Sequence, residues 1–120
     1  MLTLINGLPD NVLGVSGEGK ITGKEYEAIL IPAIEDKLKR NKKISLLYQL
    51  GGKFEGFYLS GLLDDAMVGM KHLFSWDKIA LVSDDKMMNT TARFLTHIMP
   101  YKLKVFNGTE LEEAKKWVSE

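Results

Sequence analysis

Three polar residues in the second half of the chain have the residue types and the position that chemistry would need. Ser83, Asp84 and Asp85 directly follow the apolar run Ile79–Val82, which has the length and composition of a buried strand. Open α/β sheets bind ligands beyond the carboxyl ends of their parallel strands, so a hydroxyl and two carboxylates there suit acid–base chemistry. A structural alternative stays open, because Asp84 or Asp85 would also cap a helix that begins near Lys86.

Other enzyme motifs are nearly absent from the sequence. The segment Gly51–Lys53 lacks the upstream glycine and the following Ser or Thr of a phosphate-binding loop. His72 and His97 lie on different predicted helices without the spacing of a metalloprotease helix, and the chain has no cysteine. The sequence therefore predicts a protein that is not an enzyme, with no metal site and no cofactor.

Composition excludes several further classes of protein. The chain has 120 residues, with 16 Lys plus Arg against 16 Asp plus Glu, and so lacks the basic excess with which nucleic-acid binders neutralise phosphates. No apolar run approaches the roughly 18 residues of a spanning helix, and the first residues lack a signal-peptide pattern. We therefore expect one cytoplasmic domain over residues 1–120, with no nucleic-acid partner.

The hydrophobic pattern predicts an α/β domain. Strands are expected at Leu2–Asn6, Val12–Glu18, Ile44–Leu50, Ile79–Val82 and Lys102–Phe106, the first two joined by turn formers as a hairpin. The predicted order is ββαβαβαβα. Because helices separate the later strands, the order favours a mostly parallel mixed sheet of about five strands flanked by four helices.

Capping signals and periodicity locate the helices. Thr22 and Glu25 form a capping box at the start of the first helix, and Pro32 is expected to kink that helix rather than end it. Thr109 and Glu112 form a second capping box before the last helix. The other two helices are expected over residues 59–74 and 87–99.

A basic cluster closes the first predicted helix. It consists of Lys37, Lys39, Arg40, Lys42 and Lys43. Cations there would favour anionic lipid headgroups by about 1 kcal/mol each near a charged surface. The helix dipole explains the same residues without a partner, since cations stabilise the carboxyl end of a helix.

The segment 57–74 has the strongest functional signal. Eleven of its 18 residues are apolar, and eight of these fall within one broad arc at helical spacing. Packing on the sheet would explain this stripe, whereas the glycines near its start favour a helix that lifts and exposes a nonpolar pocket or a lipid-binding surface. The expected ligand-binding residues are Phe54, Phe57, Tyr58, Leu62, Leu63, Met67, Met70, Trp76 and Met87, and the expected membrane contacts are Leu59, Leu63, Met67, Met70 and Phe74.

The order of elements and several landmarks resemble the bacterial SpoIIAA-like group, which shares its fold with STAS domains. The internal Pro32, the segment Phe54–Gly56 and the strand within Trp76–Asp84 carry this resemblance, which covers nearly the whole chain. It implies a SpoIIAA-like (STAS-like) α/β fold. It also implies regulatory protein contacts, phosphorylation at a serine, nonpolar-ligand binding and membrane association.

The resemblance also implies a phosphosite at Ser60. The family's antagonist motif reads Asp-Ser-Ser-Gly-Leu-Gly, and Leu59–Leu62 is its nearest match, without the Asp and the final Gly. We expect a binding module for a nonpolar small molecule or lipid, with transient contact to the inner face of the membrane. The alternatives are a regulatory partner-switch protein with a protein partner, and a homodimer that buries the apolar stripe.

Overall fold

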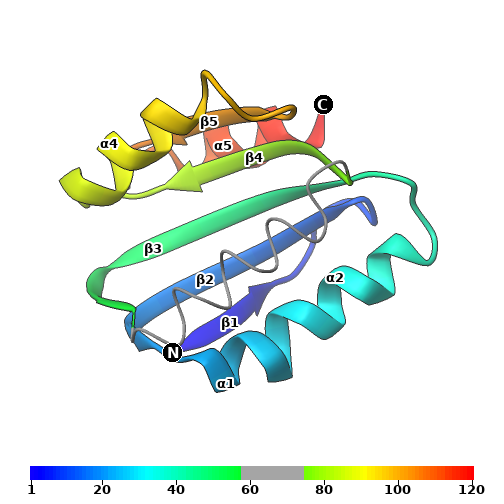
Figure 1. Cartoon of the computed structure of the whole chain (residues 1–120), viewed down its shortest axis with the longest axis horizontal. Helices are drawn as coiled ribbons and strands as arrows, with labels where there is room; N and C mark the ends of the chain where they lie inside the picture. The colour runs from blue at the N-terminus through cyan, green and yellow to red at the C-terminus, as the bar shows by residue number, and fades with distance from the viewer. Residues whose placement is uncertain (58–74) are drawn as a thin grey trace.

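Five β-strands form one sheet at the centre of the protein (Figure 1). The structure is a computed structural model that describes the backbone of residues 1–57 and 75–120 and the side chains of residues 1–51 and 75–120. The strands lie in the order β1-β2-β3-β4-β5, so neighbours in the sequence are neighbours in the sheet. They are β1 (Leu2–Ile5), β2 (Val12–Ile21), β3 (Ile44–Phe57), β4 (Trp76–Val82) and β5 (Lys102–Phe106).

Strand pairing is antiparallel between β1 and β2 and parallel between all later neighbours. Leu4 lies opposite Val15 in the antiparallel hairpin, and Leu47 lies opposite Ala80 where β3 and β4 run side by side. The apolar runs of β3 and β4 follow from this position, because a parallel strand is covered on both faces. The mostly parallel mixed sheet of five strands confirms the predicted fold class.

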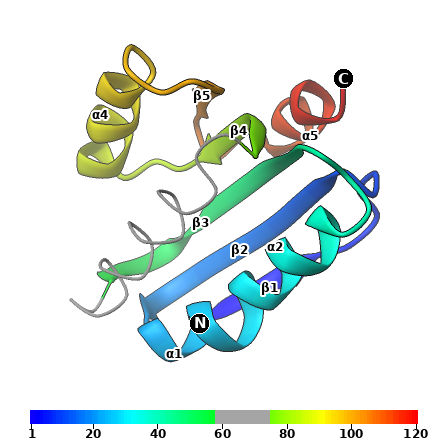
Figure 2. The ribbon, with the colours of Figure 1, turned by 45° about the vertical axis from the view of Figure 1, so that its right-hand side comes forward.

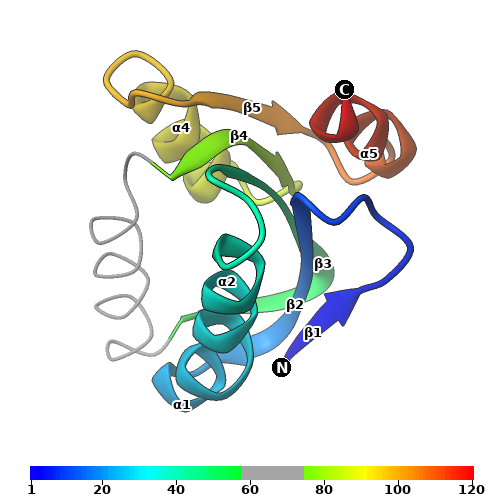
Figure 3. The same ribbon diagram turned by 90° about the vertical axis from the view of Figure 1, so that its right-hand side faces the viewer.

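Helices cover both faces of the sheet (Figure 3). One face packs against the π-helical turn η1, α2 and α4, with Ile34 and Ala92 in its core. The other face packs against α5 through Ala114 and Val118. Figure 2 shows α1 and α2 along β1 and β2, with α4 beside β5. The bounds are α1 (Gly23–Glu25), η1 (Tyr26–Leu30), α2 (Ile31–Leu38), α4 (Lys86–Leu95) and α5 (Leu111–Ser119).

The first helix continues through Pro32, as predicted. Its start is capped by Thr22, whose Oγ1 accepts a hydrogen bond from the Glu25 backbone N–H at 3.3 Å. The turn before Pro32 is π-helical, and the Ile31 N–H donates to the carbonyl of Tyr26. This wider turn makes room for the proline ring, which would clash with the carbonyl four residues earlier in a regular helix.

The strand β3 is longer than predicted. The prediction ended it at Leu50, before two glycines, yet pairing with β2 continues to Phe57. It continues because β2 also extends, with register shifts on both sides of Gly19. Gly19 has φ +60, a left-handed conformation that suits glycine at a bulge. Phe54 and Phe57 therefore lie on a strand and not in a loop.

The second predicted capping box is wrong. The helix α5 begins at Leu111, and the Thr109 Oγ1 donates to Asn107 Oδ1 at 2.6 Å instead of capping the helix. Glu110 Oε1 accepts the Asn107 N–H at 2.8 Å, so these side chains stabilise the turn before α5. Similarly, α4 ends at Leu95, before its predicted end. The helix expected over 59–74 lies outside the described residues.

Candidate functional site

The outward side of α4 and of the turn after it carries three large, exposed apolar side chains. Met87, Phe94 and Ile98 are 80%, 68% and 61% exposed. Spacings of seven and four residues place them on one side of α4 and of the turn that follows it. The opposite side of α4 packs on the sheet through Asn89 and Ala92. We call these three exposed residues the α4 stripe, and a surface helix ordinarily has polar residues in their place.

Two cations, Lys86 and Arg93, lie on the same helix as the α4 stripe. From Lys86 to Phe106 the sequence contains no Asp or Glu. The same stretch holds four exposed cations. Two of them lie on α4, whereas the two on β5 alternate with Leu103 and Val105 and share the face of Phe106 that packs against α5. Apolar side chains flanked by cations are typical of surfaces that meet partners which are both apolar and anionic. The four cations are Lys86, Arg93, Lys102 and Lys104.

The predicted ligand-binding residues do not gather in one place. Trp76 begins β4 and is buried in the core, whereas Met87 follows the far end of that seven-residue strand and is exposed. Trp76 pairs with Ile44 at the start of β3, while Phe57 ends β3. A strand of this length separates its ends by about 20 Å. Trp76 therefore lies apart from Met87 and from Phe57, and its burial fits packing in the core.

The remaining apolar residues of the prediction are not placed by the structure. For Phe54 the backbone position on β3 is known, and the others lie outside the described residues. Phe94 and Ile98 were missed, because an apolar residue on a helix looks the same in sequence whether it faces core or solvent. The absence of acid around them was the available signal. The residues outside the described part are Tyr58, Leu59, Ser60, Leu62, Leu63, Met67, Met70 and Phe74.

The polar residues after β4 join neighbouring loops. Asp85 caps α4, and its Oδ1 accepts the Met88 N–H at 2.9 Å. Asp84 Oδ1 accepts the Gly108 N–H at 2.9 Å, which connects this loop to the loop after β5. Ser83 is buried, and its Oγ accepts the Asp85 N–H at 3.0 Å. The structural alternative, a helix cap, is confirmed for Asp85.

The basic cluster at the end of α2 is partly engaged within the protein. Arg40 forms ion pairs with Asp10 at 2.8 Å and with Asp36 at 3.1 Å. The Lys37 Nζ donates to the backbone carbonyl of Asp10 at 2.9 Å. Hydrogen bonds from Arg40 and then Asn41 lower the pKa of Asp10 to about 2. These contacts fasten the carboxyl end of α2 to the loop between β1 and β2.

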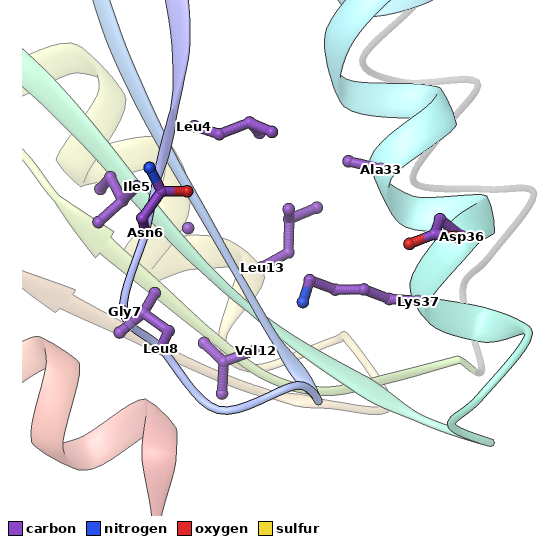
Figure 4. A pocket seen from close by; sticks show the side chains of 11 residues that line it. Leu4, Ile5, Asn6, Gly7, Leu8, Val12, Leu13, Ala33, Asp36 and Lys37 are labelled. Atoms are coloured by element: carbon purple, nitrogen blue, oxygen red, sulfur yellow. The ribbon is translucent and has the colours of Figure 1, made fainter.

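The same contacts border a cavity at the β1 edge of the sheet (Figure 4). It has a volume of about 320 Å³ and lies between β1, the loop after it, the start of β2 and α2. Its lining is mainly apolar, with Asn6, Asp36 and Lys37 as the polar side chains. No sequence pattern predicted this cavity, because it forms between a hairpin and a helix that are distant in the chain.

Residues 1–57 and 75–120 contain neither a cluster of metal ligands nor a helix that could span a membrane. No group of three or more His, Asp or Glu side chains in this part of the chain is arranged to hold a metal ion. None of the helices described there combines the length and apolar character needed to cross a membrane.

Comparison with known proteins bears on the fold. A family model described as SpoIIAA-like matches residues 12–119. A solved structure from Shewanella loihica PV-4, an uncharacterized protein of the DUF3478 family with a SpoIIAA-like fold, aligns with a TM-score of 0.77. The two chains are 22% identical over 98% of this chain and 92% of that chain. No curated protein matches the chain. The predicted SpoIIAA-like fold is thereby confirmed.

Proposed function

The chain belongs to the SpoIIAA-like family, and from that premise we propose that it is a non-enzymatic binding module for lipid. In this proposal, apolar side chains take up a lipid-like molecule or attach the protein to the surface of an anionic membrane. The proposal rests on the α4 stripe, in which three exposed apolar side chains lie within an acid-free stretch of sequence.

The size of the stripe sets the expected strength of binding. Full burial of a Met, Phe or Ile side chain is worth about 1.5–3 kcal/mol, so three side chains that are mostly exposed would contribute roughly 4 kcal/mol. Association costs at least about 4 kcal/mol in lost freedom of motion. Each cation near an anionic surface adds about 1 kcal/mol. Binding should therefore be weak on neutral membranes and strong only on anionic ones.

The amphipathic segment 57–74 would add to the same contact. Its apolar residues include Leu63 and Met70, which the proposal assigns to lipid. This segment connects β3 to β4, and α4 connects β4 to β5, so both belong to connections between adjacent parallel strands.

Liposome flotation tests the proposal. Purified protein would be mixed with vesicles of neutral phosphatidylcholine, or with vesicles that also contain phosphatidylserine. We expect flotation with the anionic vesicles, and its loss in Phe94→Glu and Leu63→Glu. Ser119→Glu is the matched control, because it adds the same charge at an exposed site on α5, on the other face of the sheet. Circular dichroism would verify that each variant is folded.

A second arm separates membrane lipid from free lipid. The protein would be titrated with a fluorescent fatty acid below its micelle concentration, with the same variants. Uptake of the probe without flotation would assign the apolar residues to a soluble ligand. If neither assay detects binding, or if all variants bind like the wild type, the lipid function is refuted.

The alternatives predict other results. A homodimer that buries the stripe would show twice the monomer mass in sedimentation, and Phe94→Glu would dissociate it. A partner-switch protein would bind a soluble protein partner, and Ser60→Asp would change that binding while flotation stayed unchanged.

A further inference from the structure

The cavity at the β1 edge has an apolar wall. Leu4 and Leu13 project toward it from β1 and β2, and Ala33 faces them from α2 (Figure 4). Leu4 is 46% exposed, so this large side chain meets the opening and not the core. A volume of about 320 Å³ lies at the lower end of the range for small-molecule sites. The wall therefore suits a short hydrocarbon group.

Opposite charges line the cavity at the carboxyl end of α2. The Lys37 Nζ donates to the Asp10 carbonyl, and its other two N–H groups have no partner in the part of the chain that the structure describes. Asp36 Oδ2 accepts from Arg40 Nη1 at 3.1 Å, while Asp36 Oδ1 accepts no hydrogen bond from the described residues. Lys37 and Asp36 are adjacent in the chain and do not pair with each other. Within the described residues, two N–H groups of Lys37 and one carboxylate oxygen of Asp36 thus remain without a partner at the same opening.

The charge balance around the cavity selects the kind of ligand. Lys37 and Arg40 carry two positive charges, and Asp10 and Asp36 carry two negative charges, so the group is neutral as a whole. A purely anionic ligand would be attracted by Lys37 and repelled by Asp36. A purely cationic ligand would be attracted by Asp36 and repelled by Lys37. A ligand that carries both charges can pair with both side chains.

We propose that this cavity binds a small zwitterion with an apolar side chain, which is the chemistry of an aliphatic α-amino acid. Its carboxylate would accept hydrogen bonds from Lys37 Nζ, its ammonium would donate to Asp36 Oδ1, and its hydrocarbon would lie against Leu4 and Leu13. The site lies at the β1 edge of the sheet, whereas the α4 stripe lies beside β5 at the other edge. The proposal is therefore independent of lipid binding.

A ligand series tests each part of this assignment. The ¹⁵N–¹H correlation spectrum of the full chain would be followed during titration with L-leucine, in parallel with three compounds that each lack one feature. These are 4-methylpentanoate, which lacks the ammonium group, 3-methylbutylamine, which lacks the carboxylate, and glycine, which lacks the hydrocarbon side chain. We expect saturable shifts for L-leucine at residues 6–14 and 33–37, and binding at least tenfold weaker for each of the other compounds.

Variants connect the shifts to the two side chains. Lys37→Met and Asp36→Asn should each weaken L-leucine binding at least tenfold. Lys39→Met should bind like the wild type, because Lys39 is exposed on the same helix end and does not line the cavity. Arg40→Gln removes the ion pair between Arg40 and Asp36 but leaves the negative charge of Asp36 in place. This variant should therefore retain L-leucine binding if Asp36 contacts the ligand directly.

Several outcomes would overturn the assignment. They are the absence of saturable shifts with L-leucine, equal binding of L-leucine and 4-methylpentanoate, and unchanged binding by Lys37→Met. Flotation of Lys37→Met with anionic vesicles should match the wild type. That measurement distinguishes failure of this site from failure of the lipid function.

Discussion

Truncation of Trp76 should destabilise the fold strongly, whereas truncation of Met87 should leave its stability unchanged. Trp76 is 4% exposed and packs in the core between the sheet and its helices, while Met87 is 80% exposed. Replacing a buried tryptophan with alanine removes roughly 150–200 Å² of buried surface, worth about 4–5 kcal/mol at about 25 cal/mol per Å². Measured losses for such truncations are about 3–5 kcal/mol.

Urea unfolding followed by far-ultraviolet circular dichroism measures both effects. Because domains of this size have total stabilities of about 5–15 kcal/mol, Trp76→Ala would lose a large share of the free energy of unfolding. Trp76→Phe is the second variant, in case the alanine variant does not fold, and it should lose a smaller part because much of the volume is kept. Met87→Ala should stay within about 0.5 kcal/mol of the wild type.

Equal losses of stability in Trp76→Ala and Met87→Ala would contradict a buried Trp76 and an exposed Met87. A loss below about 1 kcal/mol for Trp76→Ala would mean that its side chain does not support the core. A loss above about 2 kcal/mol for Met87→Ala would mean that this side chain is covered in solution. Far-ultraviolet dichroism is preferred to fluorescence, because Trp117 would remain as a second emitter.

Two further predictions concern charged side chains. Asp85→Ala removes the cap of α4 and should lower the free energy of unfolding by about 1 kcal/mol in urea, and an unchanged value would exclude the cap as a stabilising contact. Arg40 and Asn41 lower the pKa of Asp10 from its ordinary 3.8 to about 2. The contact therefore stabilises the fold above about pH 4, and its contribution disappears as the pH falls toward 2. The stabilities of wild type and Asp10→Asn should converge over that interval in acid unfolding, and a constant difference would contradict this.

The core of the fold could be predicted from sequence, and the ends of its elements could not. The apolar runs of β3 and β4 are strong local signals, so their presence and order were predicted correctly. The end of β3 depends on pairing with the extended β2 across a bulge at Gly19, which is a contact between distant parts of the chain. Gly51 and Gly52 instead indicated that the strand ends at Leu50.

Capping signals show the same limit at a smaller scale. The boxes Thr22–Glu25 and Thr109–Glu112 have the same spacing, yet only the first caps its helix. In the second, α5 begins at Leu111 with Glu110 at the N-cap position, and Thr109 belongs to the turn before it, where its Oγ1 donates to Asn107 Oδ1. The spacing of a capping box therefore does not by itself fix the residue at which a helix begins.

Among the candidate site residues, the sequence predicted roles that depend on neighbouring residues and did not predict those that depend on distant contacts. The local role of Asp85 as a helix cap was predictable, because it depends only on the residues that follow it. Trp76 and Met87 are close in sequence, but the extended strand β4 lies between them and keeps them apart in space. The cavity beside β1 requires the hairpin and α2 to meet, and no local pattern encodes that meeting.

Exposure explains why the α4 stripe, and not Trp76, supports a binding function. The apolar character of Trp76 is fully accounted for by the core that it fills. Phe94 and Ile98 are mostly exposed, so they add little to the stability of the fold while they increase the tendency to aggregate. Polar residues at both positions would improve solubility at little cost in folding free energy. The proposed lipid contact would account for the apolar character of both residues, and the cations Lys86 and Arg93 on the same helix would favour an anionic surface.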